Sequence, residues 1–223
     1  MANILITGAG TGLGKELALQ YAVQGHTLFL LGRTKQKLDT AKQQIEEKGG
    51  KAKVVVCDLA DRKQVKDTIG MITETDSIDW LINNAGAGHF GALADLTDDE
   101  IEKMIDTNMR GTIYMTKDLL PHLLGRPSAK VMNIISTAGL RGKVNESVYC
   151  ATKFAVRGFT ESLVKELEDT PVAVTAVYMG GMDTPFWSES DHVKDPSRLK
   201  SPAAVAEMIV SQDDGQAEIF IDK

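Results

Sequence analysis

The chain has 223 residues, of which 43% are hydrophobic and 25% charged, a composition typical of a globular protein with a substantial core. Its formal net charge of −6 argues against a nucleic-acid-backbone binder, although local basic groups could bind a small anion. Two cysteines, Cys57 and Cys150, are too few for a disulfide framework. No segment approaches the ~20 apolar residues of a membrane span, and the amino terminus lacks a secretion signal. We therefore expect a cytoplasmic protein that does not enter a membrane.

Short apolar runs alternate with longer segments of helical periodicity along the chain. The predicted strands lie at residues 4–6, 28–31, 54–56, 80–82, 131–135, 172–178 and 219–221. The predicted helices span residues 14–24, 34–48, 61–73, 97–124, 147–168 and 201–212. Strands that are apolar on both faces and regularly separated by helices indicate a parallel sheet covered on both sides. The sequence therefore predicts one continuous α/β domain over residues 1–223.

A glycine-rich turn from Gly8 to Gly14 joins the first predicted strand to the first helix. Such glycines let the backbone approach a phosphate, and the helix amino terminus adds unpaired N–H groups and a positive dipole end. The nucleoside-triphosphate loop is excluded, because Ala9 replaces its first glycine and Glu16 its hydroxyl residue. The common Gly-x-Gly-x-x-Gly pattern fails at Leu13, which leaves Thr-Gly-x-x-x-Gly-x-Gly. The turn predicts a nucleotide site at the carboxyl edge of the sheet.

Tyr149 and Lys153 are four residues apart, so in a helix they lie on one face about one turn apart. A phenol normally titrates near pH ~10, and a close cation favours its ionised form. The pair is a candidate proton donor and acceptor, with Ser136 shortly before it in the sequence. An amphipathic helix with a solvated lysine is the simpler alternative for the pair alone.

The order of these motifs resembles the short-chain dehydrogenase/reductase family over nearly the whole chain. The motifs that carry the resemblance are the turn at 7–14, Asn83-Asn84-Ala85-Gly86, Asn108, Ser136, Tyr149 with Lys153, and the segment 180–184. The resemblance implies a Rossmann-like, doubly wound sheet of about seven parallel strands with helices on both faces. It also implies a nicotinamide dinucleotide bound along the carboxyl ends of the strands.

The resemblance assigns a role to each catalytic candidate. Tyr149 gives a proton to the developing alkoxide or accepts it in oxidation, and Lys153 lowers the pKa of Tyr149 and holds the nicotinamide ribose. Ser136 binds the carbonyl oxygen, and Asn108 holds a water that links Lys153 to solvent. Ser136 as a turn cap and Asn108 as a buried amide remain alternatives. The residues implied to bind the cofactor are Gly8, Thr11, Gly12, Leu13, Gly14, Arg33, Asp58, Leu59, Asn84, Ala85, Gly86, Tyr149, Lys153, Gly180 and Thr184.

The end of the second predicted strand favours NADP(H) over NAD(H). An acid about 20 residues past the glycine turn would bind the free ribose hydroxyl of NAD, but the sequence there has Arg33. Arg33 can pair with a 2′-phosphate through a charge-assisted fork. Against this, Thr11 stands where many NADP-preferring relatives carry a second basic residue, and Arg33 could be a solvated helix-start residue. Asp58 either contacts the adenine, by family analogy, or caps the next helix.

The substrate is expected to meet three segments, at residues 87–91, 137–145 and 185–200. Phe186 and Trp187 either anchor a mobile lid or pin the last segment locally. Arg141 and Lys143 either attract an acidic or acyl-carrier substrate or are merely solvated. Met179 replaces the proline usual in the family, which predicts a looser turn before Gly180. The four histidines show no ligand spacing, so no metal site is predicted.

The predicted helices at 97–124 and 147–168 have apolar positions beyond what one sheet face needs. Family members pair through these helices, so a homodimer is expected, with core packing as the alternative. The favoured function is an NADP(H)-dependent oxidoreductase acting on a small ketone, aldehyde or secondary alcohol. A non-catalytic NAD(P)-binding redox-sensing regulator is the alternative, and retention of Tyr149 and Lys153 favours the enzyme. A 3-oxoacyl-carrier-protein-type reductase remains open within the enzyme class.

Overall fold

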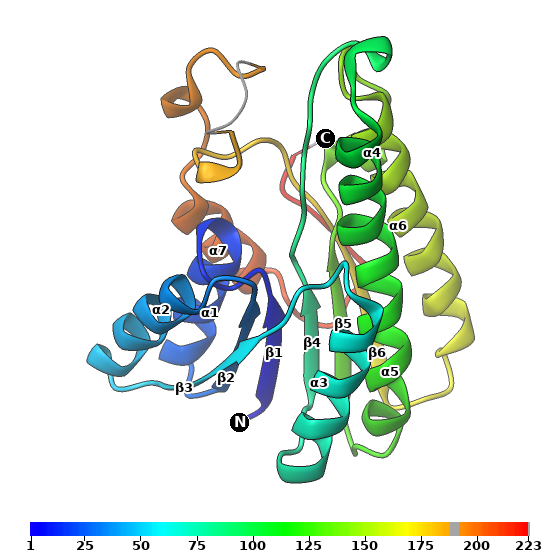
Figure 1. Cartoon of the computed structure of the whole chain (residues 1–223). Helices are drawn as coiled ribbons and strands as arrows, with labels where there is room; N and C mark the ends of the chain where they lie inside the picture. Colours follow the sequence, from blue (N-terminus) through cyan, green and yellow to red (C-terminus); the bar gives the residue numbers. More distant parts are fainter. Residues whose placement is uncertain (188–191, 223) are drawn as a thin grey trace.

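The protein is built on one parallel sheet in the computed structural model, which describes residues 1–187 and 192–222. The sheet has seven strands in the order β3-β2-β1-β4-β5-β6-β7 (Figure 1). The strands are β1 (Asn3–Thr7), β2 (Thr27–Gly32), β3 (Lys51–Val56), β4 (Trp80–Asn83), β5 (Ala129–Ile134), β6 (Val172–Tyr178) and β7 (Glu218–Phe220). Because the strand order reverses between β1 and β4, a crevice opens at their carboxyl ends.

Helices cover both faces of the sheet (Figure 1). α1, α2 and α7 pack on one face, while α3, α5 and α6 pack on the other. The helices are α1 (Gly12–Val23), α2 (Lys35–Glu47), α3 (Arg62–Thr75), α4 (Asp98–Met104), α5 (Thr112–Leu124), α6 (Ser147–Glu166) and α7 (Pro202–Ser211). The local chemistry agrees, since Thr97 and Glu100 form a capping box before α4 and Pro202 opens α7.

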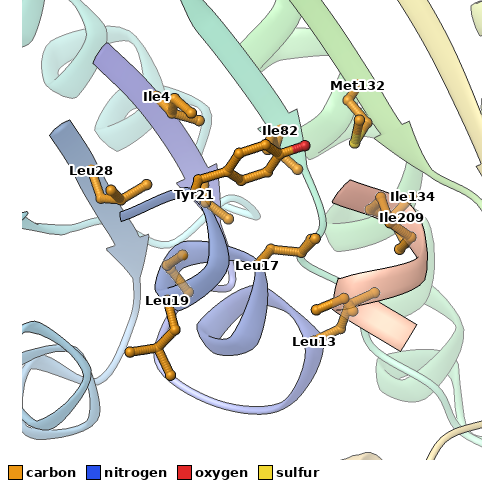
Figure 2. Close-up of a cluster of buried hydrophobic side chains, with 14 of the residues drawn as sticks. Ile4, Leu13, Leu17, Leu19, Tyr21, Leu28, Ile82, Met132, Ile134 and Ile209 are labelled. Atoms are coloured by element: carbon orange, nitrogen blue, oxygen red, sulfur yellow. The ribbon is translucent and has the colours of Figure 1, made fainter. Parts of the chain in front are cut away.

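The core has one large apolar cluster on each side of the sheet. In the first, Leu17 of α1 and Ile209 of α7 lie in one cluster with the strand residues Ile4, Ile82 and Met132 (Figure 2). All five are fully buried. Each such side chain contributes roughly 1.5–3 kcal/mol of transfer free energy. These two clusters hold the carboxyl ends of the strands in a fixed arrangement.

Every predicted strand and helix is present, and the predicted doubly wound parallel sheet is confirmed. One element differs. The helix expected at 97–124 contains a π-helical turn, η2 (Ile105–Gly111), between α4 and α5. Gly111 packs so closely on the segment before α3 that a Cβ there would lie 2.9 Å from Leu59 Cβ. Such turns occur often at functional sites, and Asn108 lies in this one.

In the described part of the chain, no helix is both long and apolar enough to cross a membrane.

Candidate active site

A cavity of about 390 Å³ runs along the carboxyl edge of the sheet and brings most of the predicted site residues together. The predicted residues that line it are Gly8, Thr11, Gly12, Leu13, Arg33, Asp58, Leu59, Asn84, Ala85, Gly86, Ser136, Tyr149, Lys153, Gly180 and Thr184. Two predicted residues, Gly14 and Asn108, are not among its lining residues.

The glycine turn forms one wall of the cavity. Gly8 and Gly12 have positive φ angles of 67° and 53°, which a residue with a side chain adopts only under strain. Thr11 precedes α1 and makes no side-chain cap, so the first N–H groups of the helix are not capped by it. Gly14 serves packing instead, because a Cβ there would lie 2.4 Å from the Gly8 carbonyl oxygen. Gly14 therefore helps to seat α1 against the turn, and its contact with the cofactor stays a prediction.

The end of β4 is cross-linked to the end of β1 beside this turn. The Thr7 hydroxyl accepts the backbone N–H groups of Asn84 and Ala85, at 2.9 and 3.0 Å. The Asn84 side-chain amide donates to the Thr7 carbonyl at 3.0 Å. Thr7 is a positioning group that the sequence analysis did not single out. These bonds fix the crevice where the strand order reverses.

Tyr149 and Lys153 lie on one face of α6, and both are buried, with 9% and 5% of their surfaces exposed. The Lys153 ammonium lies 5.7 Å from the centroid of the Tyr149 ring. It donates to the Ile134 carbonyl, at the end of β5, at 3.1 Å. Ser136 follows the same strand and is also buried. The structure thus brings the three predicted catalytic side chains to one end of the cavity.

The pKa values of this group are set mainly by burial. Burial raises the pKa of Tyr149 above its ordinary value, and a hydrogen bond with Ser136 partly opposes that shift. Burial lowers the pKa of Lys153 to about 8. Desolvation sets the direction of this shift in the protein alone, and the lowering of the Tyr149 pKa by Lys153 stays a prediction. The phenol is therefore held in its protonated form.

Ser136 has a strained backbone. Its φ of 105° and ψ of 155° fall in a region that is essentially restricted to glycine and costs roughly 1–3 kcal/mol. Its hydroxyl oxygen accepts the Ala138 N–H at 3.2 Å and so caps the short 3-10 turn η3 (Thr137–Gly139). The turn-cap alternative is thus correct for one hydrogen bond. The same backbone conformation also places the hydroxyl in the cavity beside Tyr149.

The side-chain amide of Asn108 makes three hydrogen bonds with protein groups. Its oxygen accepts the Ala87 N–H at 2.7 Å, and its nitrogen donates to the Ala87 carbonyl at 2.9 Å and to Thr152 Oγ1 at 3.0 Å. Thr152 in turn donates to the Tyr149 carbonyl at 2.7 Å. These contacts favour the buried-amide alternative for the side chain. Asn108 clamps the loop after β4 to the turn of α6 that carries Tyr149.

The opposite end of the cavity is basic. Arg33, which directly follows β2, lines it together with Lys37 of α2, four residues further along the chain. Lys37 was missed in the sequence, although its spacing from Arg33 at the start of a predicted helix could have indicated it. Asp61, rather than Asp58, caps α3 by accepting the N–H groups of its first turn. Asp58 lines the cavity instead.

The substrate end of the cavity is lined by Lys143, Glu146, Pro185, Phe186 and Trp187. Of the three segments expected there, 87–91 contributes no lining residue, and 137–145 contributes only Lys143. The segment expected at 185–200 includes residues 188–191, which lie outside the described residues. Glu146 was missed, because only the folded chain reveals its place at the cavity.

The turn at Met179 is held on both sides. The Met179 carbonyl accepts the Thr137 N–H at 2.9 Å, and the Gly180 N–H donates to Asp222 Oδ2 at 2.9 Å. Met179 itself is buried against the cavity. The turn is therefore anchored at both residues, and the looser turn expected without proline stays a prediction. In the part of the chain that the structure describes, no group of three or more His, Cys, Asp or Glu residues could hold a metal ion.

The family model described as short chain dehydrogenase matches residues 2–195. The chain belongs to the short chain dehydrogenase family. The resemblance read from the motifs is thereby confirmed. As a member of this family the protein is an oxidoreductase, and the family binds NAD or NADP.

Relatives and solved structures agree with this assignment. An uncharacterized oxidoreductase of Staphylococcus epidermidis is 34% identical over 188 residues, with 84% of this chain and 80% of the relative covered. The sepiapterin reductase of Chlorobaculum tepidum is 32% identical over 196 residues, with the same 84% and 80% covered. A variant of the actinorhodin polyketide ketoreductase, solved with NADPH, superposes with a TM-score of 0.90 at 27% identity. That comparison covers 99% of this chain and 95% of the ketoreductase.

Proposed function

We propose that the protein transfers a hydride between NADP(H) and a small carbonyl compound or secondary alcohol, with Tyr149 as general acid and base. One observation carries the proposal: a single cavity is lined by the glycine turn and Arg33 at one end and by Ser136, Tyr149 and Lys153 at the other. A cavity with these residues at its two ends fits a dinucleotide, and the amino terminus of α1 would bind its phosphates. The cofactor supplies the hydride.

The side chains at the reactive end divide the remaining work. Ser136 donates a hydrogen bond to the carbonyl oxygen and orients it toward the Tyr149 phenol. Tyr149 gives its proton to the oxygen as negative charge develops there. Lys153 binds the ribose hydroxyls and carries the charge that stabilises the phenolate after transfer. Burial keeps Tyr149 protonated near neutral pH, so the phenol can act as the acid in reduction. The relay through Asn108 becomes a positioning role in this proposal.

The decisive test follows NADPH absorbance while carbonyl compounds are screened, beside Tyr149→Phe. The panel includes benzaldehyde, diacetyl and an acetoacetyl thioester, the last because Lys143 lines the cavity. We expect the variant to lose about 10²–10⁴-fold in rate while its NADPH dissociation constant stays unchanged. Turnover by Tyr149→Phe at the normal rate would refute the mechanism. NADPH binding without turnover on the panel would favour the redox-sensing regulator.

The preference for NADP(H) rests on Arg33 and Lys37. Together they offer two cations at the end of the cavity proposed to hold the adenosine ribose and its 2′-phosphate. Arg33→Asp should raise KM for NADPH roughly tenfold or more relative to NADH, because a charge-assisted contact becomes a repulsion. Lys35→Asp is a matched control, since Lys35 is exposed and pairs with Asp39 on α2. Equal changes for both cofactors would contradict the preference.

A second copy of the chain is the proposed partner. A groove of about 370 Å³ between α5 and α6 is lined by Ile113, Thr116, Lys117, Leu120, Pro121, Leu124, Phe159 and Leu163. The groove is largely apolar, which suits burial against the same helices of another subunit. Leu120→Arg should shift the protein from dimer to monomer in sedimentation measurements. A wild-type monomer at micromolar concentration would reject this assembly.

A further inference from the structure

Glu146 is the residue just before α6, a position from which a short polar side chain often caps the helix. It makes no such cap. Only 7% of its surface is exposed, and it lines the cavity three residues before Tyr149. Burial of a carboxylate requires partners to offset its desolvation.

The Glu146 carboxylate lies between two basic groups. Its Oε1 is 2.9 Å from His192 Nε2, and its Oε2 is 3.9 Å from Lys143 Nζ. Only the first distance is that of a hydrogen bond. His192 is 46 residues away in sequence, in the segment that follows Trp187. Glu146 thus joins the start of α6 to a different region of the chain.

His192 belongs to a set of nearly parallel rings that we call the aromatic wall, consisting of Phe90, Trp187 and His192. The centroid of the Phe90 ring lies 4.8 Å from that of His192 and 5.1 Å from that of Trp187, and both pairs are stacked. Phe90 also meets the Tyr149 ring edge-on at 5.5 Å. Phe90 thus joins the aromatic wall to the proposed proton donor, and Trp187 of the same wall lines the cavity.

We propose that Glu146 is a positioning residue for the carbonyl substrate: by binding His192 it holds the aromatic wall against Tyr149 and so sets the width of the substrate site. The proposal rests on the proposed function. It assigns Glu146 no contact with the reacting atoms. Its carboxylate acts through His192 and Phe90.

The neutral substitution Glu146→Gln would alter two measurable quantities. First, the weaker contact with His192 would loosen the aromatic wall and raise KM for the carbonyl compound. Second, in addition to burial, the negative charge of Glu146 raises the pKa of Tyr149, so its removal should lower that pKa. Reduction needs the protonated phenol, and the alkaline limb of the kcat profile should therefore move to lower pH. The other ionisable groups around the carboxylate, Lys143, His192 and Cys150, are unchanged in Glu146→Gln.

The experiment compares wild type, Glu146→Gln, His192→Gln and the double variant with diacetyl and benzaldehyde at saturating NADPH. Each single variant should raise KM roughly tenfold, the size expected when a charge-assisted hydrogen bond is weakened. The double variant should be no worse than either single one, because both remove the same contact. The NADPH dissociation constant should not change. Glu161→Gln is the control, since Glu161 is an exposed residue of α6 paired with Arg157.

A second readout does not need turnover. Trp80 and Trp187 are the two tryptophans, so in a Trp80→Phe background all tryptophan fluorescence comes from Trp187. Glu146→Gln should increase quenching of its fluorescence by acrylamide severalfold. Unchanged quenching, or KM effects that add in the double variant, would overturn the proposal. A wild-type protein inactive on the whole panel would count against the proposed function, while the quenching result would still decide the role of Glu146.

Discussion

In the described part of the chain, one buried Tyr–Lys cluster lies at the carboxyl ends of the strands, the carboxyl edge, and another at their amino ends, the amino edge. The two clusters differ in whether a carboxylate joins the tyrosine to the lysine. At the carboxyl edge, Tyr149 and Lys153 meet Ser136 and the Ile134 carbonyl at the end of β5. At the amino edge, about 13 Å away by strand length, Lys130 lies near the start of the same strand. There a carboxylate, Asp213, joins Lys130 to Tyr21.

The carboxylate decides what each cluster can do. Asp213 accepts the Tyr21 hydroxyl at 2.7 Å and pairs with the Lys130 ammonium, which also lies 4.3 Å from the Trp80 ring centroid. The amino-edge cluster is saturated, and it ties α1 and the end of α7 to the sheet. Among the described residues Lys153 pairs with no carboxylate, and burial lowers its pKa to about 8. The same residue types thus form a structural clamp with Asp213 and, in the function proposed above, a proton-transfer pair without such an acid.

The largest effect on stability is expected from a substitution that breaks the clamp. Asp213→Ala leaves the Lys130 ammonium and the Tyr21 hydroxyl buried without their partner, and should cost about 3–5 kcal/mol of unfolding free energy. Carbonyl reduction by the folded variant should be unaffected, because the clamp is at the other edge of the sheet. Urea unfolding and steady-state kinetics measure the two effects.

A paired substitution sharpens that result. Lys130→Met with Asp213→Leu replaces the ion pair by apolar groups and should recover most of the lost stability, since buried pairs are often neutral relative to well-packed apolar residues. A loss of similar size in both variants would mean that packing, rather than charge pairing, holds this edge.

The next effect concerns pH and the lysine at the carboxyl edge. The pKa of Lys153 is about 8 in the folded protein against 10.5 for the unperturbed side chain, so the unfolded chain binds more protons between these values. Lys153 therefore adds stability as pH rises from about 8 to about 10. Lys153→Met should abolish this rise in the free energy of unfolding. A difference in unfolding free energy between wild type and variant that stays constant with pH would contradict the lowered pKa of Lys153.

Comparing the stability of wild type with that of Lys153→Met also cancels the contributions of other titrating groups. The raised pKa values of Tyr149 and Tyr21 lower stability only above about pH 10, where unfolded tyrosine ionises. Buried Cys57 and Cys150 also have raised pKa values and act alike in both proteins. Subtracting the two stability curves leaves the contribution of Lys153.

Much of this arrangement could be predicted from the sequence, because the signals are local. Apolar runs indicated the strands, and the glycine turn indicated the crevice. Tyr149 and Lys153 could be placed on one helix face from their spacing alone. The family assignment is confirmed, whereas the individual site roles, the homodimer and the cytoplasmic location stay predictions.

The parts that could not be predicted depend on contacts between distant residues. Asp213 meets Tyr21 across 192 residues, and His192 meets Glu146 across 46. No periodicity links such positions. The contacts of the Asn108 side chain likewise depend on the π-helical turn, which regular helical spacing does not indicate.

The smallest expected effect tests the strain at Ser136. Ser136→Ala and Ser136→Gly both remove the hydroxyl, so both should lose activity to a similar extent. Only glycine adopts the φ of 105° without strain, although it also has more conformational entropy to lose on folding. The glycine variant should therefore be more stable than the alanine variant by about 1 kcal/mol.

The matched comparison is Asn145, the other described residue that has a side chain and a positive φ, here 62°. Asparagine tolerates this left-handed conformation, so Asn145→Gly should gain less relative to Asn145→Ala than Ser136→Gly gains relative to Ser136→Ala. Equal stability of the two Ser136 variants would show that the surrounding fold does not store strain there. A clear difference would mean that holding the Ser136 hydroxyl beside Tyr149 costs stability through backbone strain. The cluster of Tyr21, Asp213 and Lys130 at the amino edge carries no such cost.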